Sequence, residues 1–502
     1  MNWLEGKTDT LRLPFGDQGF SKSGQGSPED LGEEGDNPSD TSMKKTKKAF
    51  LIIALLFLSL PTRPAKAQMI FLEMNGYYRL RSDYLYLLYP KVTGQKPPEN
   101  IGYMVQRLRL EPAVVVEERV RVKSQIDLLD DMAWGNNYRA GYLEESPVAG
   151  DTVTGISGEE QDALRVKRVW AEIESPFGLF RLGRQPVNFG LQAFLDSGDG
   201  QTFSFGDSHY GETRDRLAYF SPPLFFLGKG EVMVAYDKLI ENPYQADRPN
   251  RDDLGFLFWL SDPNDDLEEW TLSYVRRGAV WEAGLWAGRQ LQNSSKTRVW
   301  LFDLYGRYRI NPFYLAGEGR FTTGKTGVDD ENLDVNQTGG LLRAGADLLT
   351  GAGEFDFGLE TGYASGDKSG KGARQTNFAP DYRVGILLYS VVMDYLTRQD
   401  GVSRPTRGGI ANSVYVHPFF KYMYAPWVSV LAGALWAYPD QVDQIIAGHD
   451  SWLGLELDAG VELKLTRRSS AGLEFGYLFS GDGLAQDFKD PFALRGKFQV
   501  VF

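Results

Sequence analysis

The chain has 502 residues, and its 67 acidic and 54 basic side chains give a net charge of −13, which argues against a nucleic-acid partner. It contains no cysteine, which excludes disulfides, thiol nucleophiles and cysteine-based metal sites. The length fits two or three ordinary domains or one large β architecture.

The first 67 residues predict a leader that precedes the folded domain. Residues 1–42 are rich in Gly, Ser and acidic residues and have no apolar period, which predicts a disordered or untranslated upstream segment. From Met43, a basic stretch precedes the apolar run "AFLIIALLFLSL" and the small-x-small site Ala65-Lys66-Ala67. This order is typical of a signal peptide over residues 43–67, cleaved before Gln68, and the run is too short for a transmembrane helix.

After Gln68 the dominant hydrophobic period is two, which predicts β-strands. In "LGLELDAGVELKL" (453–465), for example, apolar side chains alternate with glycines and charged residues. Many such runs exceed ten residues, whereas about five or six is typical of soluble proteins. Tight turns alternate with long polar connections, while a soluble sandwich would turn about every 8–12 residues. The pattern therefore predicts an all-β protein, a transmembrane antiparallel β-barrel over residues 68–502.

The placement of turns and loops predicts the number of strands. If tight turns lie at one end of the barrel and long loops at the other, the count must be even, and about 18 strands (16–18) fit the chain. This count takes 253–262 as one strand. It also takes 268–290 as one long strand with a bulge at "RRG".

The face opposite the apolar one should line the lumen, and in the N-terminal strands it carries cations. Because these residues lie on neighbouring strands, we expect their charges not to neutralise one another. The alternative is that lumen charges only solvate a wet interior and pair with one another. We call this set the basic ladder, and it comprises Arg79, Arg81, Arg107, Arg109, Arg119, Arg121, Lys123, Arg165, Lys167 and Arg181.

Residues 166–190, "VKRVWAEIESPFGLFRLGRQPVNFG", resemble a hairpin of Gram-negative porins, with an Arg-bearing strand, an "FG" turn and a "GRQ" strand. Residues 197–220 are similar to the next loop and strand of porin-like families. The resemblance spans about 55 residues. It fits large porins of 16–18 strands, including uncharacterised myxobacterial porin-like proteins and, more distantly, alginate-export barrels, and implies a channel without naming its solute.

Two acidic loops, 196–207 and 329–334, lack the spacing of a calcium loop, so no metal or cofactor is expected. Within the long connection 366–410, apolar residues recur at helical spacing. We expect this helix either to narrow the barrel mouth as a constriction or to pack on top of the loops. The residues of this predicted constriction helix are Val384, Leu387, Leu388, Val391, Val392 and Tyr395.

The C-terminal strands carry carboxylates on the predicted lumen face. Together with the basic ladder they should create a transverse electric field across the lumen. A hydrolase would need a serine and an orienting group beside a histidine such as His417, and no Gly-x-Ser-x-Gly motif is present, so an enzyme is not expected. We call this set the acidic wall, and it comprises Asp356, Glu360, Glu456, Asp458, Glu462 and Glu474.

The chain ends on "LRGKFQVVF" (494–502), in which apolar and polar residues alternate up to Phe502. This strand is similar to the terminal signal by which the outer-membrane assembly machinery recognises Gram-negative barrels. We expect it to pair with the first strand and close the barrel.

The sequence thus predicts an outer-membrane porin for small hydrophilic or charged solutes, surrounded by lipid and lipopolysaccharide. A closed barrel acting as an adhesin or scaffold is the alternative. A monomer and a trimer both remain open.

Overall fold

The structure is a computed structural model of a single barrel domain. It describes residues 70–86, 100–117, 119–135, 164–198, 205, 211–239, 267–293, 295–327, 333–367, 373–397, 406, 408–442, 452–484 and 488–502. The predicted upstream segment and signal peptide, and the predicted strand 253–262, lie outside these residues. Among the described residues, no helix has the length and apolar character needed to span a membrane.

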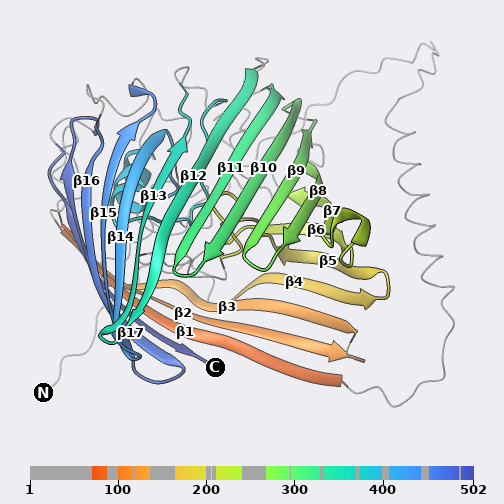
Figure 1. Cartoon of the computed structure of the whole chain (residues 1–502), viewed down its shortest axis with the longest axis horizontal. Helices are drawn as coiled ribbons and strands as arrows, with labels where there is room; N and C mark the ends of the chain where they lie inside the picture. The colour runs from red at the N-terminus through yellow and green to blue at the C-terminus, as the bar shows by residue number, and fades with distance from the viewer. Residues whose placement is uncertain are drawn as a thin grey trace, which may run out of the picture. The chain divides into compact units, whose positions relative to one another are not determined.

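Eighteen antiparallel strands form one closed sheet, in which each strand pairs with its neighbours in the sequence and β1 pairs with β18 (Figure 1). The strands are β1 (Ile70–Tyr86), β2 (Asn100–Val116), β3 (Val120–Gly135), β4 (Leu164–Ser175), β5 (Gly178–Pro186), β6 (Thr213–Phe220), β7 (Glu231–Leu239), β8 (Glu268–Arg277), β9 (Trp281–Gln292), β10 (Thr297–Ile310), β11 (Phe313–Thr326), β12 (Leu333–Thr350), β13 (Gly353–Ala364), β14 (Ser413–Ala425), β15 (Val428–Pro439), β16 (Gly454–Lys464), β17 (Ser469–Ser480) and β18 (Phe492–Val501). The predicted barrel of 18 strands is confirmed.

One predicted strand is wrong. Residues 268–290 form two strands, β8 and β9, because the chain reverses at Gly278–Val280, where the Gly278 N–H donates to the Trp281 carbonyl at 2.7 Å. The count of described strands is still even because β7 pairs with β8 and β8 pairs with β9. Two connections at the long-loop end are also short, at 293–296 and 327–332.

The barrel closes through its first and last strands, as the sequence predicts. Tyr77 lies opposite Val501 in the β1–β18 register. Beyond that pair, Gly76 and Phe502 exchange two backbone hydrogen bonds of 3.1 and 3.0 Å. A Cβ atom added to Gly76 would lie 2.3 Å from the Arg109 carbonyl oxygen, so this close approach of strands requires glycine.

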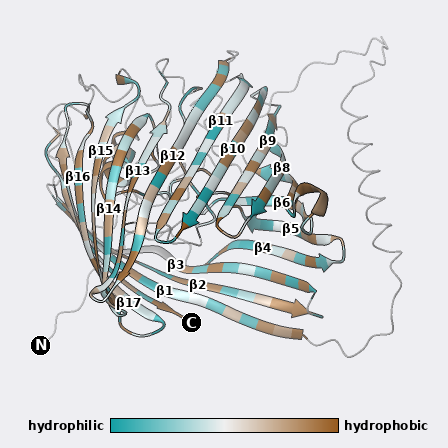
Figure 2. Ribbon diagram, in the orientation of Figure 1, coloured by the Kyte–Doolittle hydropathy of each residue, from teal (hydrophilic) through white to brown (hydrophobic). Residues whose placement is uncertain are grey.

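The outer face of the barrel is apolar. Large side chains such as Leu272, Leu304 and Leu342 are more than half exposed, while charged residues on the opposite faces of the strands are buried. Figure 2 shows this as alternating brown and teal along single strands. An exposed apolar surface of this extent is unfavourable in water and favourable in lipid, so the architecture is that of a porin-like membrane barrel.

The main apolar core lies inside the barrel. Wall residues Leu85, Ile101 and Tyr415 pack with the inward-folded segment 373–397, which contains two short helices, η3 (Leu388–Met393) and α4 (Asp394–Thr397). A second cluster joins Phe189, from the connection that follows β5, to lumen-facing residues of β6–β10. Two connections from the long-loop end therefore fold into the barrel and occupy part of the lumen.

Candidate functional site

The structure places most of the basic ladder on the inner face of β1–β5. Arg79, Arg81, Arg107 and Arg109 are each less than 7% exposed, and Arg79 lies directly opposite Arg107 in the register. Arg165 and Lys167 are partly buried on β4. Arg119 precedes β3 in the tight turn and is exposed, so it lies at the rim of the ladder.

The ladder is partly neutralised, contrary to our expectation. Carboxylates from the same strands reach between the cations, and the Arg109 guanidinium donates two hydrogen bonds of 2.6 and 2.8 Å to Asp127. The expectation fails because it considered only the cations on each strand and left out Asp83, Asp127, Glu172 and Glu174. Further ion pairs of the ladder include Arg81 with Asp83, Lys123 with Glu172, Arg181 with Glu172, and Arg121 with Glu174.

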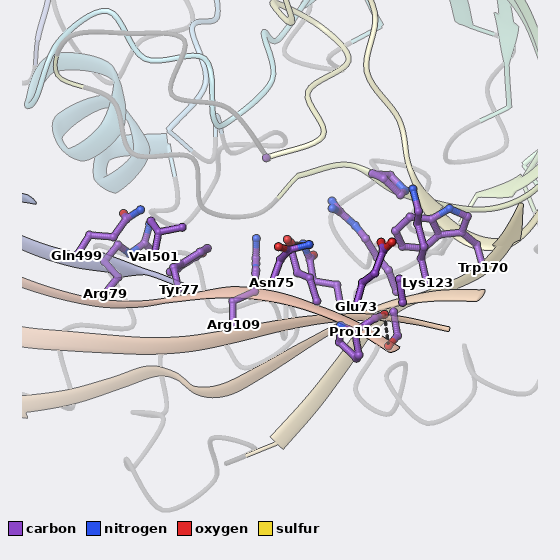
Figure 3. A pocket seen from close by; sticks show the side chains of 17 residues that line it. Glu73, Asn75, Tyr77, Arg79, Arg109, Pro112, Lys123, Trp170, Gln499 and Val501 are labelled. Carbon is purple, nitrogen blue, oxygen red and sulfur yellow. Dashed lines mark hydrogen bonds between the residues drawn. The ribbon is translucent and has the colours of Figure 1, made fainter. Parts of the chain in front are cut away.

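A cavity of about 550 Å³ lies against this wall. Figure 3 shows Glu73, Asn75, Tyr77, Arg109 and Lys123 standing on the same side of strands β1–β3, toward the cavity. Its lining combines cations with two aromatic rings, and the Arg109 guanidinium lies 5.5 Å from the centre of the Tyr77 ring. The charged and aromatic lining residues are Glu73, Tyr77, Arg79, Arg109, Glu111, Lys123, Arg168 and Trp170.

Arg168 is a lumen residue that the sequence analysis missed. Strict alternation from Arg165 and Lys167 points position 168 outward, but the β3–β4 register shifts so that Gln125 faces Arg168 and Ile126 faces Val166. This bulge turns Arg168 inward, where its guanidinium donates to the Ser197 carbonyl at 2.6 Å. The period of the sequence carries no signal for a bulge at this position.

One residue of the acidic wall, Glu456, joins the inward-folded segment to the barrel wall. Glu456 is fully buried and accepts hydrogen bonds from the backbone N–H groups of Ile386, Leu387 and Leu388 at 2.6, 2.6 and 2.7 Å. Asp458 is buried on the same face of β16.

The remaining acidic-wall residues also have partners, and three of them pair with cations, so the acidic wall is partly neutralised, as the basic ladder is. These contacts are Asp356 with the Tyr314 hydroxyl, Glu360 with Arg343 and the Tyr415 hydroxyl, Glu462 with Lys421, and Glu474 with Lys497.

The predicted constriction helix lies inside the barrel, and its regular part is shorter than predicted. It begins at Leu388, so Val384 and Leu387 precede it, and the described side chains from 387 to 393 are nearly or fully buried. The Tyr389 and Ser413 hydroxyls lie 2.6 Å apart and join the segment to β14, and burial raises the pKa of Tyr389. Val391 and Val392 pack in the same cluster, while the side chain of Tyr395 lies outside the described residues.

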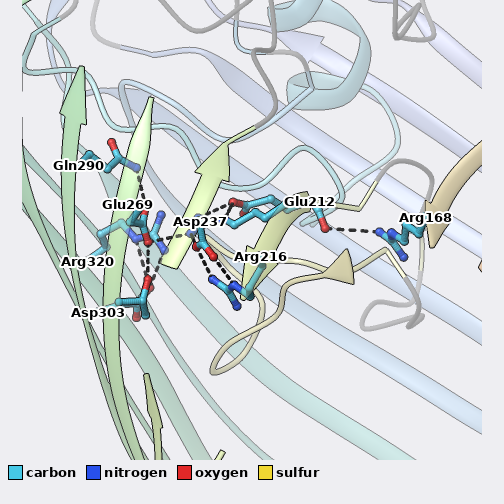
Figure 4. A network of polar contacts seen from close by, with 10 residues as sticks. Arg168, Glu212, Arg216, Asp237, Glu269, Gln290, Asp303 and Arg320 are labelled. Carbon is cyan, nitrogen blue, oxygen red and sulfur yellow. Dashed lines mark hydrogen bonds and ion pairs between the residues drawn. The ribbon is translucent and has the colours of Figure 1, made fainter. Parts of the chain in front are cut away.

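Polar contacts join buried charged side chains on the inner face of β6–β11 (Figure 4). The connection after β5 packs against the same group of strands. Arg214 contacts Asp237 and Glu269 at 2.9 and 2.7 Å, and all three side chains are buried. The Glu318 carboxylate accepts a hydrogen bond from the Leu191 N–H, which fixes that connection to β11. This side of the lumen is therefore packed.

A smaller cavity of about 250 Å³ lies against β10–β14. Arg343 and Asp356 line it from the wall, Arg383 and Val384 line it from the inward-folded segment, and His417 lies beside them. Its lining mixes both signs of charge, with three arginines and two aspartates, whereas four cations and two glutamates line the larger cavity.

No protein-family model matches the chain, and no curated protein matches it either. Among solved structures, it is similar to OccK9 (OpdG) of Pseudomonas aeruginosa, with 12% identity over 86% of this chain and 99% of that one and a TM-score of 0.49. It is also similar to OpdK of the same organism with vanillate (13% identity, 86% and 98% coverage, TM-score 0.46) and to an anion-selective porin from Comamonas acidovorans (11%, 86% and 100%, 0.42). Sequence identities of 11–13% indicate a similar fold and carry no information on the solute.

Proposed function

We propose that the chain is an outer-membrane channel that lets small hydrophilic solutes diffuse through its lumen, with a preference for anions. The observation that carries this proposal is the cavity of about 550 Å³ beside the basic ladder. Barrels of about eight strands fill their own interior, whereas 16–18 strands leave an aqueous passage. Among the described residues, the inward-folded connections fill much of the rest of the lumen apart from the cavity of about 250 Å³, which leaves the larger cavity along β1–β4 as the proposed passage.

The preference for anions follows from the residues along this passage. Four cations, Arg79, Arg109, Lys123 and Arg168, line the cavity against two carboxylates, Glu73 and Glu111. The carboxylates that pair with the ladder, such as Asp127 and Glu172, lie on the same group of strands. Paired cations still present N–H donors to a passing anion, while each carboxylate oxygen used in an ion pair is less available to a cation. The fields of charges in a water-filled lumen extend over about 8–10 Å at physiological salt, so they act on a solute throughout a narrow passage.

The test is a planar-bilayer measurement of conductance and reversal potential. We expect the purified chain to form channels and the triple variant R79Q/R109Q/K123Q to shift the reversal potential towards cation selectivity. The shift should shrink near 1 M salt, because the screening length there is only about 3 Å.

The matched control is R184Q/R289Q. Both arginines lie on outer faces of strands, where Arg184 pairs with Asp215 and Arg289 lies 5.3 Å from the centre of the Trp300 ring. We expect this variant to keep the wild-type reversal potential. An equal shift in both variants would contradict anion conduction along the ladder, and absence of any channel would favour the closed barrel acting as an adhesin or scaffold.

A further inference from the structure

The connection between β6 and β7, residues 221–230, lines neither of the two cavities described above. It has ten residues, whereas the other fully described connections at the same end of the barrel have two to four. It contains Pro222 and Pro223 and a short helix, η1 (Phe225–Leu227). Phe225 and Phe226 are 81% and 82% exposed, more than almost any other large apolar side chain of the described residues.

The connection is held in one shape by its own hydrogen bonds. Leu224 and Gly230 form an antiparallel bridge, in which the Leu224 N–H donates to the Gly230 carbonyl at 2.9 Å. Gly228 adopts a φ of 66° and its N–H donates to the Phe225 carbonyl at 3.0 Å, which closes the helical turn. The two phenylalanines are therefore presented by an ordered tip.

This tip lies over the outer face of the barrel. Tyr274 and Arg276 alternate along β8 on the same face as Leu272, which is 54% exposed. The Tyr274 hydroxyl donates to the Leu227 carbonyl at 2.6 Å, and a Cβ atom added to Gly228 would lie 2.8 Å from the Arg276 guanidinium carbon. Figure 2 shows the tip as a brown turn next to β6 and β7. The exposed rings therefore continue the apolar surface that the strands present outward.

Two cations lie at the tip, one beside the Phe225 ring and one beside Trp281 of β9. The Lys229 ammonium lies 5.6 Å from the centre of the Phe225 ring, and the Arg276 guanidinium lies 5.3 Å from the centre of the Trp281 ring. Among the described residues neither cation forms an ion pair, whereas the adjacent Arg277 pairs with Glu231 and Glu282. Lysine and arginine next to aromatic rings, on an apolar surface, are typical of the boundary between acyl chains and phosphate groups.

We propose that the β6–β7 connection is a membrane anchor that binds an anionic glycerophospholipid of the leaflet at the tight-turn end. Phe225 and Phe226 enter the acyl region, while Lys229 and Arg276 bind the lipid phosphate. The proposal rests on the membrane location given under the proposed function. A lipid is the proposed ligand because the tip is continuous with the lipid-facing surface and carries the positive charge that an anionic headgroup requires.

The first test measures how deeply the tip enters the bilayer. Since the chain has no native cysteine, F226C carries a single thiol for an environment-sensitive fluorophore, and it leaves the ring of Phe225 beside Lys229 in place. The matched control is G351C, in the two-residue turn between β12 and β13 at the same end, where a Cβ meets no atom within 4 Å. In vesicles with nitroxide-labelled acyl chains, we expect strong quenching of the label at 226 and weak quenching of the label at 351.

Conductance of the same labelled samples separates the two proposals. Channels of wild-type conductance together with an unquenched, aqueous label at 226 would overturn the anchor and leave the channel standing. Absence of conductance with a quenched label would overturn the channel and support the anchor.

The second test measures lipid selectivity with spin-labelled phosphatidylglycerol and phosphatidylcholine. We expect the wild type to enrich phosphatidylglycerol at its surface and K229Q/R276Q to lower the enrichment to about the value for phosphatidylcholine, because each removed cation weakens attraction to an anionic headgroup. K464Q, which removes an exposed lysine at the tight-turn end of β16, should keep the enrichment. Equal enrichment in the wild type and K229Q/R276Q would refute the phosphate site.

Discussion

Two buried carboxylates, Glu456 and Glu318, each bind backbone N–H groups of a connection that folds into the lumen. A carboxylate that accepts N–H donors from the backbone forms charge-assisted hydrogen bonds, which are stronger than neutral ones. Glu456 does this for three consecutive residues of the inward-folded segment, and Glu318 does it for Leu191 in the other connection. The sequence could place Glu456 on the inner face of a strand from its alternation. It could not show that the partners are backbone groups about 70 residues away, because no periodic pattern encodes such a contact.

We predict that E456Q loosens the inward-folded segment. The neutral amide is a weaker acceptor, and its NH₂ group cannot accept from Leu388, so roughly 1.5–3 kcal/mol of local stabilisation should be lost. Hydrogen exchange of the amides of residues 386–388 should become faster, and single-channel current should become noisier.

E462Q is the matched control for this prediction. Glu462 lies on the same strand, and it pairs with Lys421 at 3.9 Å and is one-third exposed. Its removal should leave exchange in 386–388 unchanged, and equal exchange in E456Q and the wild type would show that Glu456 does not hold the segment.

At the scale of single elements, the period of two predicted the strands well and failed where the chain departs from regular geometry. The reversal at 278–280 has only three residues, so it resembles a bulge within one long alternating segment. This explains the error over 268–290. Helical spacing over 384–395 located the buried segment but overestimated its regular length, since regular helix covers only 388–397. Packing against the barrel wall, and not helix propensity, stabilises this segment, so its boundaries could not be derived from local sequence.

We predict that the inward-folded segment limits conductance. Replacement of residues 384–396 by a Gly-Ser linker of equal length should raise single-channel conductance, because it removes the apolar side chains that pack inside the barrel. Folding of the variant is checked by its resistance to detergent unfolding on a gel. A folded variant with wild-type conductance would place the conducting path away from this segment.

At the scale of the whole molecule, closure of the sheet depends on two ends of the chain that are more than 400 residues apart in the sequence. Closure gives each of the 18 described strands a neighbour on both sides, which a bilayer requires because its core offers no water to bond free backbone groups. The sequence predicted this pairing from the alternation in 494–502, since a terminal strand with one apolar face needs a partner on each side. The requirement for Gly76 became visible only in three dimensions.

We therefore predict that closure can be damaged from either end of the chain. Deletion of Phe502 removes the two backbone hydrogen bonds to Gly76, and G76A places a methyl group 2.3 Å from the Arg109 carbonyl oxygen and 2.9 Å from the Phe502 ring. Both changes should lower the yield of assembled barrel in the outer membrane and in refolding assays. Conductance per assembled channel should stay at the wild-type value, because neither change removes a cation from the cavity.

F502Y is the control, since it keeps the aromatic ring and the backbone bonds, and we expect nearly normal assembly. A normal yield for the deletion would show that the terminal residue is dispensable for closure. A normal yield for G76A alone would show that the strands can move apart enough to hold a methyl group.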